Sequence, residues 1–169
     1  VGDDMAKAKA VGGKDAVERI RRLMRRCSDE LPPPEPELPF VVDLDLRLGL
    51  QDRLHAAWTD FNACEWMGAT VFACVVLEAL LMWKIKEANA AMPGTPGKQD
   101  VDKMTLNDLI DDAAARKLIS PDSRSQAHLA RDARNLVHPG KAARSGTSFS
   151  KATALTALAA VYRVVGDFK

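Results

Sequence analysis

The chain has 169 residues, 47% of them apolar and 28% charged, which suits one domain with a hydrophobic core and a well-solvated surface. Only 5% of the residues are aromatic, while alanine and leucine are abundant, and this favours a helical protein over a sandwich or barrel. The net charge of +1 is unevenly spread: residues 113–151 hold eight Lys or Arg against two acids, which favours an anionic partner there.

The three cysteines, Cys27, Cys64 and Cys74, form an odd set without metal-ligand spacing. Cys64 and Cys74 lie in an apolar helical pattern, where a free thiol behaves as a small apolar side chain. We therefore expect a reducing, cytoplasmic setting, with no metal and no cofactor. Residues 1–13 lack the apolar stretch of a signal peptide, and we interpret them as a disordered lead.

Residues 14–27 predict a basic amphipathic helix, because apolar residues recur on one face every three or four positions. Arginines cover the other faces, and the apolar residues are Val17, Ile20, Leu23, Met24 and Cys27. This segment is either an arm that contacts RNA or a partner, or a helix whose charged face is simply solvated. Runs of charged residues more often belong to solvated helix faces. Residues 28–43 contain five prolines and are interpreted as a linker to the main domain, residues 44–169.

A long helical pattern extends from about Gly49 to Met92, with a break expected between Asn62 and Gly68. Its apolar run, Trp66–Trp83, approaches the roughly 20 residues that cross a membrane. Glu78 lies inside this run, and a carboxylate at that depth is costly in lipid. We therefore interpret the run as the buried central helix of a soluble domain rather than as a membrane span.

Three further helices are expected, each bounded by residues that favour helix ends. Thr105 and Asp108 have the spacing of a capping box at the start of the first. Ser120 is the expected N-cap of the second, which Pro139 and Gly140 are expected to end. Because no pair of strand patterns is present, the predicted fold is an all-α bundle of four to five core helices with an N-terminal helical arm. The expected bounds are about Thr105–Lys117, Asp122–Val137 and Phe149–Phe168.

The sequence "RDARNLVHPGK", Arg131–Lys141, places a polar cluster at the end of the second of these helices. At 100° per residue, Arg131, Arg134 and His138 fall on one face, and Asn135 lies one step round. Histidine exchanges protons at physiological pH and arginine binds phosphate through two N–H groups, so the set suits metal-independent cleavage of an RNA phosphodiester. The alternative is a purely structural one, in which these cations satisfy the carbonyls and the dipole of the helix end.

The cluster resembles the signature of the HEPN superfamily, a group of helical bundles with an arginine, four to six intervening residues and a histidine. Arg131, followed by the polar Asp132, has six residues before His138, whereas Arg134 has only three. The signature arginine is therefore Arg131. The segment "RNLVHPG" is similar to the asparagine-containing version of the motif, and the resemblance covers about residues 44–168.

The resemblance implies a metal-independent endoribonuclease in a toxin or defence system, acting as a homodimer whose two motifs form one composite cleft for RNA. An antitoxin protein would be a further partner. Arg131 and His138 would be catalytic, while Arg134, Asn135 and Lys141 would bind or position RNA. The alternative is a non-catalytic HEPN-like module that binds a protein partner or RNA.

Glu78 is the other side chain that needs an explanation, because a carboxylate midway along a buried helix is costly without a partner. We expect it either to pair with Arg131 or Arg134 and orient that guanidinium, or to face a solvent gap or cap a neighbouring helix. His128, three residues before Arg131, either lines the same face or is exposed, and His55 is expected at the surface.

Overall fold

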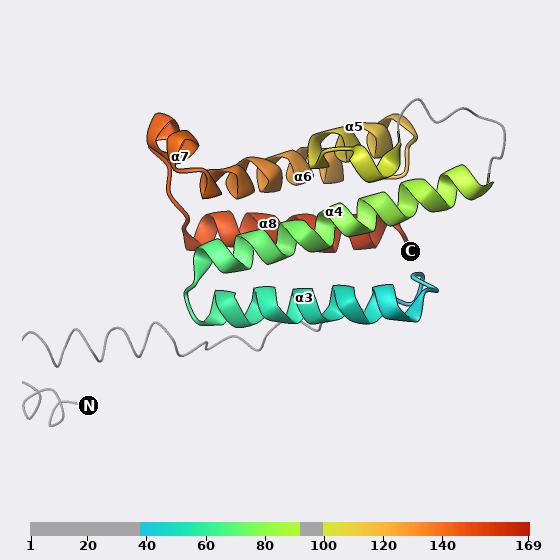
Figure 1. Ribbon diagram of the computed structural model, residues 1–169, viewed down its shortest axis with the longest axis horizontal. Coiled ribbons are helices and arrows are strands. Elements are labelled where there is room, and N and C mark those ends of the chain that lie inside the picture. The colour runs from blue at the N-terminus through green and yellow to red at the C-terminus, as the bar shows by residue number, and fades with distance from the viewer. Residues whose placement is uncertain (1–37, 92–99) are drawn as a thin grey trace, which may run out of the picture.

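The computed structural model describes residues 38–91 and 100–169, and these ranges contain helices and no strand (Figure 1). The predicted all-α helical bundle is confirmed. The predicted lead, the arm of residues 14–27 and most of the proline-rich linker lie outside the described residues. The α-helices are α3 (Leu44–Asn62), α4 (Trp66–Ala91), α5 (Leu106–Ala115), α6 (Pro121–Arg134), α7 (Pro139–Ser145) and α8 (Lys151–Asp167), and the 3-10 helices are η1 (Val101–Lys103) and η2 (Asn135–Val137).

Helix α4 is the centre of the bundle and packs against α3, α5, α6 and α8. In Figure 1 it crosses in front of α8, with α3 on one side and α5 and α6 on the other. Its fully buried side chains include Leu77, Leu80 and Leu81. By length and composition α4 could cross a membrane, but 44% of its most apolar window is buried by the rest of the chain. It therefore packs as the core helix that the sequence predicted.

Helix α6 approaches its neighbours closely because its buried face carries only small side chains, Ser123, Ala127, Ala130 and Ala133. The thiol of Cys74 on α4 lies 3.4 Å from the backbone oxygen of Ala130. This face packs against α4, α5 and α8. The close packing fixes the position of α6 along the bundle and its rotation about its own axis. Helix α6 carries most of the polar cluster.

The predicted caps of α5 and α6 are confirmed. Thr105 and Asp108 form the capping box, with the Thr105 amide donating to the Asp108 carboxylate at 2.9 Å. The Ser120 side chain caps α6, and Pro121 is its first residue. Helix α3 begins before the expected Gly49, because the Asp43 carboxylate accepts the amide of Leu46 at 3.0 Å.

The end of α6 corrects the sequence prediction. The α-helix stops at Arg134, the 3-10 helix η2 follows, and Pro139 begins the short helix α7 instead of ending a helix. Proline suits the first helical position, since its missing N–H is not needed there and its φ is already helical. Gly146, with a φ of 62°, then ends α7 in the left-handed conformation that glycine adopts without strain.

Candidate functional site

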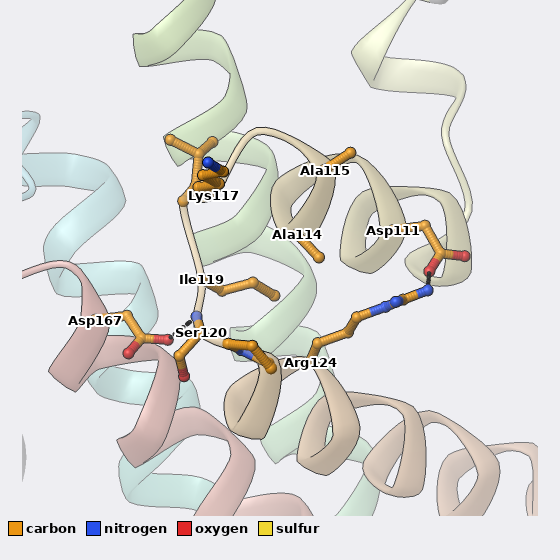
Figure 2. Close-up of a pocket in the computed structure, with 10 residues that line it drawn as sticks. Asp111, Ala114, Ala115, Lys117, Ile119, Ser120, Arg124 and Asp167 are labelled. Carbon is orange, nitrogen blue, oxygen red and sulfur yellow. Dashed lines mark hydrogen bonds and ion pairs between the residues drawn. The ribbon is translucent and has the colours of Figure 1, made fainter.

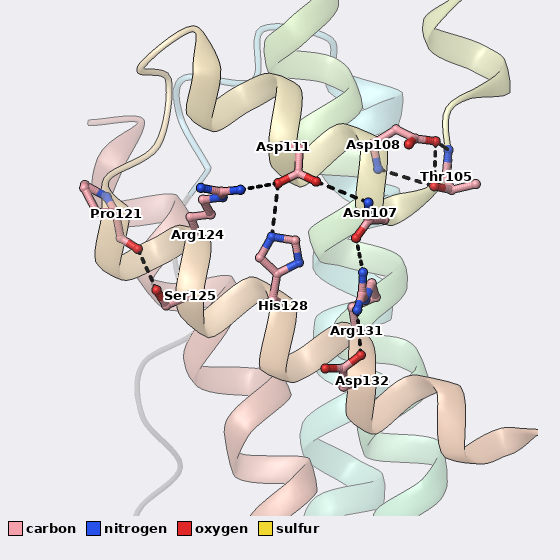
Figure 3. Close-up of polar contacts among 10 residues, drawn as sticks. All are labelled: Thr105, Asn107, Asp108, Asp111, Pro121, Arg124, Ser125, His128, Arg131 and Asp132. Carbon is pink, nitrogen blue, oxygen red and sulfur yellow. Dashed lines mark hydrogen bonds and ion pairs between the residues drawn. The ribbon is translucent and has the colours of Figure 1, made fainter. Parts of the chain in front are cut away.

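Arg131 is held against α5 by a network of polar side chains (Figure 3). One terminal nitrogen of its guanidinium donates to the amide oxygen of Asn107, and the other donates to the Asp132 carboxylate at 2.7 Å. The Nε atom is buried and has no hydrogen-bond partner among the described residues. The Arg131 guanidinium is therefore fixed in orientation by neighbours within the chain.

The same network continues along α5 and α6. The Asn107 amide donates to the Asp111 carboxylate at 3.2 Å, and Arg124 donates to Asp111 at 2.7 Å. The ring of His128 lies 3.3 Å from the same carboxylate. The hydrogen bond from Arg124, supported by the charges of His128 and Arg124, lowers the pKa of Asp111, although burial acts in the opposite direction. Asp111 is thus the anionic centre that ties α5 to α6.

Sequence reasoning missed Asn107, Asp111 and Arg124 and singled out only His128 from this part of the network. A signal was present, because Asn107 and Asp111 are four residues apart on one helix. On the next helix, Arg124, His128 and Arg131 recur at spacings of four and three. Two facing polar stripes of this kind indicate contact between helices.

Arg134 is directed away from this network and towards α4. Its Nη1 atom lies 2.8 Å from the Glu78 carboxylate, and the two side chains keep 36% and 29% of their surface exposed. The expectation that Glu78 pairs with Arg131 or Arg134 is confirmed for Arg134. One turn before Glu78, burial raises the pKa of the Cys74 thiol to about 12, with smaller opposing effects of Arg134 and Glu78.

His138 is an exposed residue between η2 and α7. Its backbone oxygen accepts the amides of Lys141 at 2.9 Å and Ala142 at 3.1 Å, which makes it the N-cap of α7. Its side chain makes no hydrogen bond or ion pair within residues 38–91 and 100–169. The imidazole is therefore open to solvent and held only by its backbone.

The single face predicted for Arg131, Arg134 and His138 is not formed. Arg131 reaches α5, Arg134 reaches α4, and His138 lies beyond the end of α6. The prediction assumed a continuous α-helix through Val137, whereas η2 changes the rotation per residue. Asn135 is the C-cap of α6, and its backbone oxygen accepts the amide of His138 at 3.2 Å.

The basic segment, residues 113–151, is partly neutralised by acids. Four of its eight cations form ion pairs, and these are Arg116–Asp112, Arg124–Asp111, Arg131–Asp132 and Arg134–Glu78. The other four, Lys117, Lys141, Arg144 and Lys151, form no ion pair with any residue that the structure describes. Lys141 and Arg144 lie on α7, and Lys151 is the first residue of α8. Two of these uncompensated cations, Lys141 and Arg144, therefore follow His138 closely in the chain.

A groove of about 360 Å³ lies between α6, α7 and the start of α8. Leu129, Ala133 and Leu136 line it, with Asp132 and Lys141 as its charged residues. Leu129 is 56% exposed, and Val137, on η2, is 43% exposed. Apolar side chains therefore accompany the cations at this end of the molecule.

A second cleft, of about 710 Å³, lies at the other end of α6 (Figure 2). Three of its charged groups are engaged within the chain: Asp111 pairs with Arg124, and the Asp167 carboxylate accepts the backbone amide of Ser120 at 2.8 Å. Lys117 also lines the cleft and forms no ion pair with a described residue. The contacts of Asp111 and Asp167 fasten the turn between α5 and α6 to the end of α8. We therefore assign this cleft a structural role.

No group of three or more His, Cys, Asp or Glu side chains suited to a metal ion occurs in the described part of the chain. Comparisons with protein-family models, with curated proteins and with solved structures gave no match.

Proposed function

We propose that the protein is a metal-independent endoribonuclease of the HEPN type and that His138 transfers the proton in its reaction. The observation that carries the proposal is the exposed imidazole of His138, which has no side-chain partner among the described residues and stands at the start of α7, the helix that carries the unpaired cations Lys141 and Arg144. An exposed imidazole near uncompensated cations offers the two things that RNA cleavage requires, a group that exchanges protons and attraction for phosphate.

In the proposed reaction the RNA 2′-oxygen attacks the adjacent phosphorus while His138 accepts the 2′-hydroxyl proton. The bond from phosphorus to the 5′-oxygen then breaks, and that oxygen takes up a proton from solvent, to which His138 later returns the proton that it accepted. The products are a 2′,3′-cyclic phosphate and a 5′-hydroxyl. Arg131 would stabilise the negative charge that develops on the phosphate, and Arg134, Asn135 and Lys141 would position the RNA.

A second copy of the chain would complete this site. Arg131 and His138 lie on different elements and project away from a common helix face, so one protomer presents only part of a phosphate-binding surface. The groove lined by Leu129 and Leu136 offers apolar area for a twin to bury next to the motif. A toxin or defence role, an antitoxin partner and a cytoplasmic location belong to the same proposal.

One observation favours a second candidate, a non-catalytic module that binds RNA or a protein. Asn107 and Asp132 occupy the Arg131 guanidinium, and Glu78 occupies that of Arg134. To bind a phosphate through two nitrogens, Arg131 has to exchange its bond to Asp132, whose side chain is 55% exposed. A module that only binds RNA would use Lys141, Arg144 and Lys151 without that exchange.

The test is cleavage of single-stranded RNA in the presence of a chelator. The wild-type chain is compared with Arg131→Ala, His138→Ala and a matched control, Arg163→Ala, which removes an exposed cation of α8. We expect cleavage by the wild type and the control, and its loss in both motif variants. Binding of RNA without cleavage by the wild type would select the non-catalytic module, and equal cleavage by all four proteins would reject the mechanism.

A further inference from the structure

Asn107 of α5 lies between Arg131 and Asp111 and bonds to both (Figure 3). Its amide oxygen accepts a hydrogen bond from the Nη1 atom of Arg131, and its amide nitrogen donates to the Oδ2 atom of Asp111 at 3.2 Å. Arg131 belongs to α6, whereas Asn107 and Asp111 belong to α5. These contacts therefore attach the guanidinium to a neighbouring helix.

The orientation of the Asn107 amide follows from the groups on either side of it. A guanidinium has only N–H donors, and an ionised carboxylate has only oxygen acceptors. The amide satisfies both neighbours only with its oxygen towards Arg131 and its nitrogen towards Asp111. Turned around, it would oppose two donors at one end and two acceptors at the other. One orientation of the amide is therefore strongly favoured.

Asp111 is itself held from α6, which keeps the amide in this orientation. Its Oδ1 atom accepts from Arg124 at 2.7 Å and lies 3.3 Å from the His128 ring, which leaves Oδ2 for Asn107. The hydrogen bond from Arg124 outweighs the effect of burial and lowers the pKa of Asp111, so this carboxylate is ionised at neutral pH. The acceptor that orients Asn107 is therefore present where the proposed reaction takes place.

We infer that Asn107 is a positioning residue that holds Arg131 ready for an RNA phosphate, and that Asp111 orients Asn107 for this task. The inference rests on the proposed function, because Arg131 is the arginine assigned there to the phosphate. Fixing a long side chain before the substrate arrives reduces the conformational freedom that is lost on binding. Without Asn107, the Nη1 atom of Arg131 keeps no hydrogen bond to a described residue.

The two partners of Arg131 differ in charge and in origin. Asp132 is an anion on the same helix, its side chain is 55% exposed, and a phosphate can take its place at the Nη2 atom. Asn107 is neutral and comes from another helix, so it stays bound while a phosphate arrives. The buried Nε atom is closed to the substrate. The RNA phosphate is therefore expected on the Asp132 side of the guanidinium.

Hydrogen exchange at the Nε–H group of Arg131 tests the positioning without RNA. This group is buried, so its exchange with solvent is slow while the guanidinium is held. Its NMR signal is identified by its absence from Arg131→Ala. We expect exchange to be at least about tenfold faster in Asn107→Ala and at least about threefold faster in Asp111→Asn. The matched control, Asn89→Ala, removes an amide that accepts from Arg116 at 2.5 Å and should leave the exchange unchanged.

Single-turnover cleavage of RNA tests what the positioning contributes. Asn107→Ala should lower the rate about tenfold, and Asn89→Ala should leave it unchanged. Lysine keeps the charge of Arg131 but lacks the planar fork of donors that Asn107 fixes. In the Arg131→Lys background, Asn107→Ala should therefore change the rate by less than about twofold. An equal loss in both backgrounds would show that Asn107 does not act through Arg131.

The two measurements separate this inference from the proposed function. Unchanged exchange in folded Asn107→Ala would overturn the positioning, whatever the variant does to RNA. Faster exchange with a wild-type cleavage rate would show that holding Arg131 does not serve the reaction, and would also reject the inference. If the wild type does not cleave RNA but exchange is faster in Asn107→Ala, the proposed function fails while the anchoring of Arg131 stands. Should Asn107→Ala fail to fold, the same measurements on Asp111→Asn decide.

Discussion

The Glu78 carboxylate of α4 and the Arg134 guanidinium of α6 meet at 2.8 Å, and this ion pair joins the central helix to the helix that carries the polar cluster. Both side chains are about one-third exposed, so the pair lies at the edge of the core. It fixes Arg134 on the α4 side of α6, whereas Arg131 is fixed on the α5 side. The pair therefore directs Arg134 towards α4, while Arg131 is directed towards α5.

Replacing Glu78 with glutamine should destabilise the fold by about 1–2 kcal/mol, between the values typical of exposed and buried pairs, because Arg134 loses its only ionic partner among the described residues. Chemical denaturation measures this difference. The matched control is Glu87→Gln, which removes an exposed pair with Lys84 at 2.7 Å and should cost less than about 0.5 kcal/mol. Equal losses of stability in the two variants would show that the Glu78–Arg134 pair stabilises the fold no more than the exposed Glu87–Lys84 pair does.

The small buried face of α6 predicts a strong response to added volume. Ala130→Leu places three extra carbon atoms where the Cys74 thiol already touches the Ala130 backbone at 3.4 Å. Overpacking of a close helix contact costs about 1–3 kcal/mol, and thermal or chemical unfolding would detect it. Ala159→Leu, at an exposed position of α8, is the control and should be nearly neutral. A neutral Ala130→Leu would contradict the close packing.

The lowered pKa of Asp111 predicts a pH-dependent contribution to stability. A carboxyl group whose pKa is lower in the folded than in the unfolded chain stabilises the fold above its unfolded pKa, and loses that effect as the pH falls through the folded pKa. Asp111→Asn should therefore cost about 0.5–1 kcal/mol near neutral pH, since its partners Arg124 and His128 are partly exposed.

The difference between wild type and Asp111→Asn should shrink as the pH is lowered through the acidic range. Unfolding curves of the two proteins from neutral to acidic pH measure it. Asp52→Asn, at an exposed position of α3, is the control. A difference that stays constant over the whole range would show that the charge of Asp111 does not contribute.

The two described cysteines should differ sharply in reactivity. Burial raises the pKa of Cys74 to about 12, and the thiolate is the species that alkylating reagents attack. In the folded protein at about pH 8, we expect Cys74 to be alkylated at least about 100-fold more slowly than the partly exposed Cys64. Peptide mass spectrometry separates the sites, and the rates should converge in denaturant. Rapid labelling of folded Cys74 would mean that α4 and α6 separate readily.

Much of the fold could be predicted from local patterns. The helix class follows from the three- and four-residue spacing, and Thr105, Ser120 and Pro121 mark helix starts because their side chains act on the nearest backbone amides. Such effects reach only a few residues along the chain. For this reason the caps were predicted correctly, and so was the need of Glu78 for a partner.

The geometry of the polar cluster could not be predicted in the same way. Pro139 is compatible with both the end and the beginning of a helix, and the change of rotation in η2 depends on how α6 and α8 pack. The network around Asp111 also needs α5 and α6 to lie side by side, and local sequence patterns do not determine such a contact between two helices. The sequence therefore identified Arg131, Arg134 and His138 as residues of interest but misplaced them relative to one another.

The most direct test of the proposed function separates binding from chemistry at His138. Single-turnover cleavage of a labelled RNA is measured with chelator, alongside the RNA dissociation constant, for wild type and His138→Ala. We predict products with 2′,3′-cyclic phosphate ends, a rate at least about 100-fold lower in the variant, and a dissociation constant changed by less than about threefold. Cleavage at the same rate by both proteins, or no cleavage by the wild type, would contradict the account.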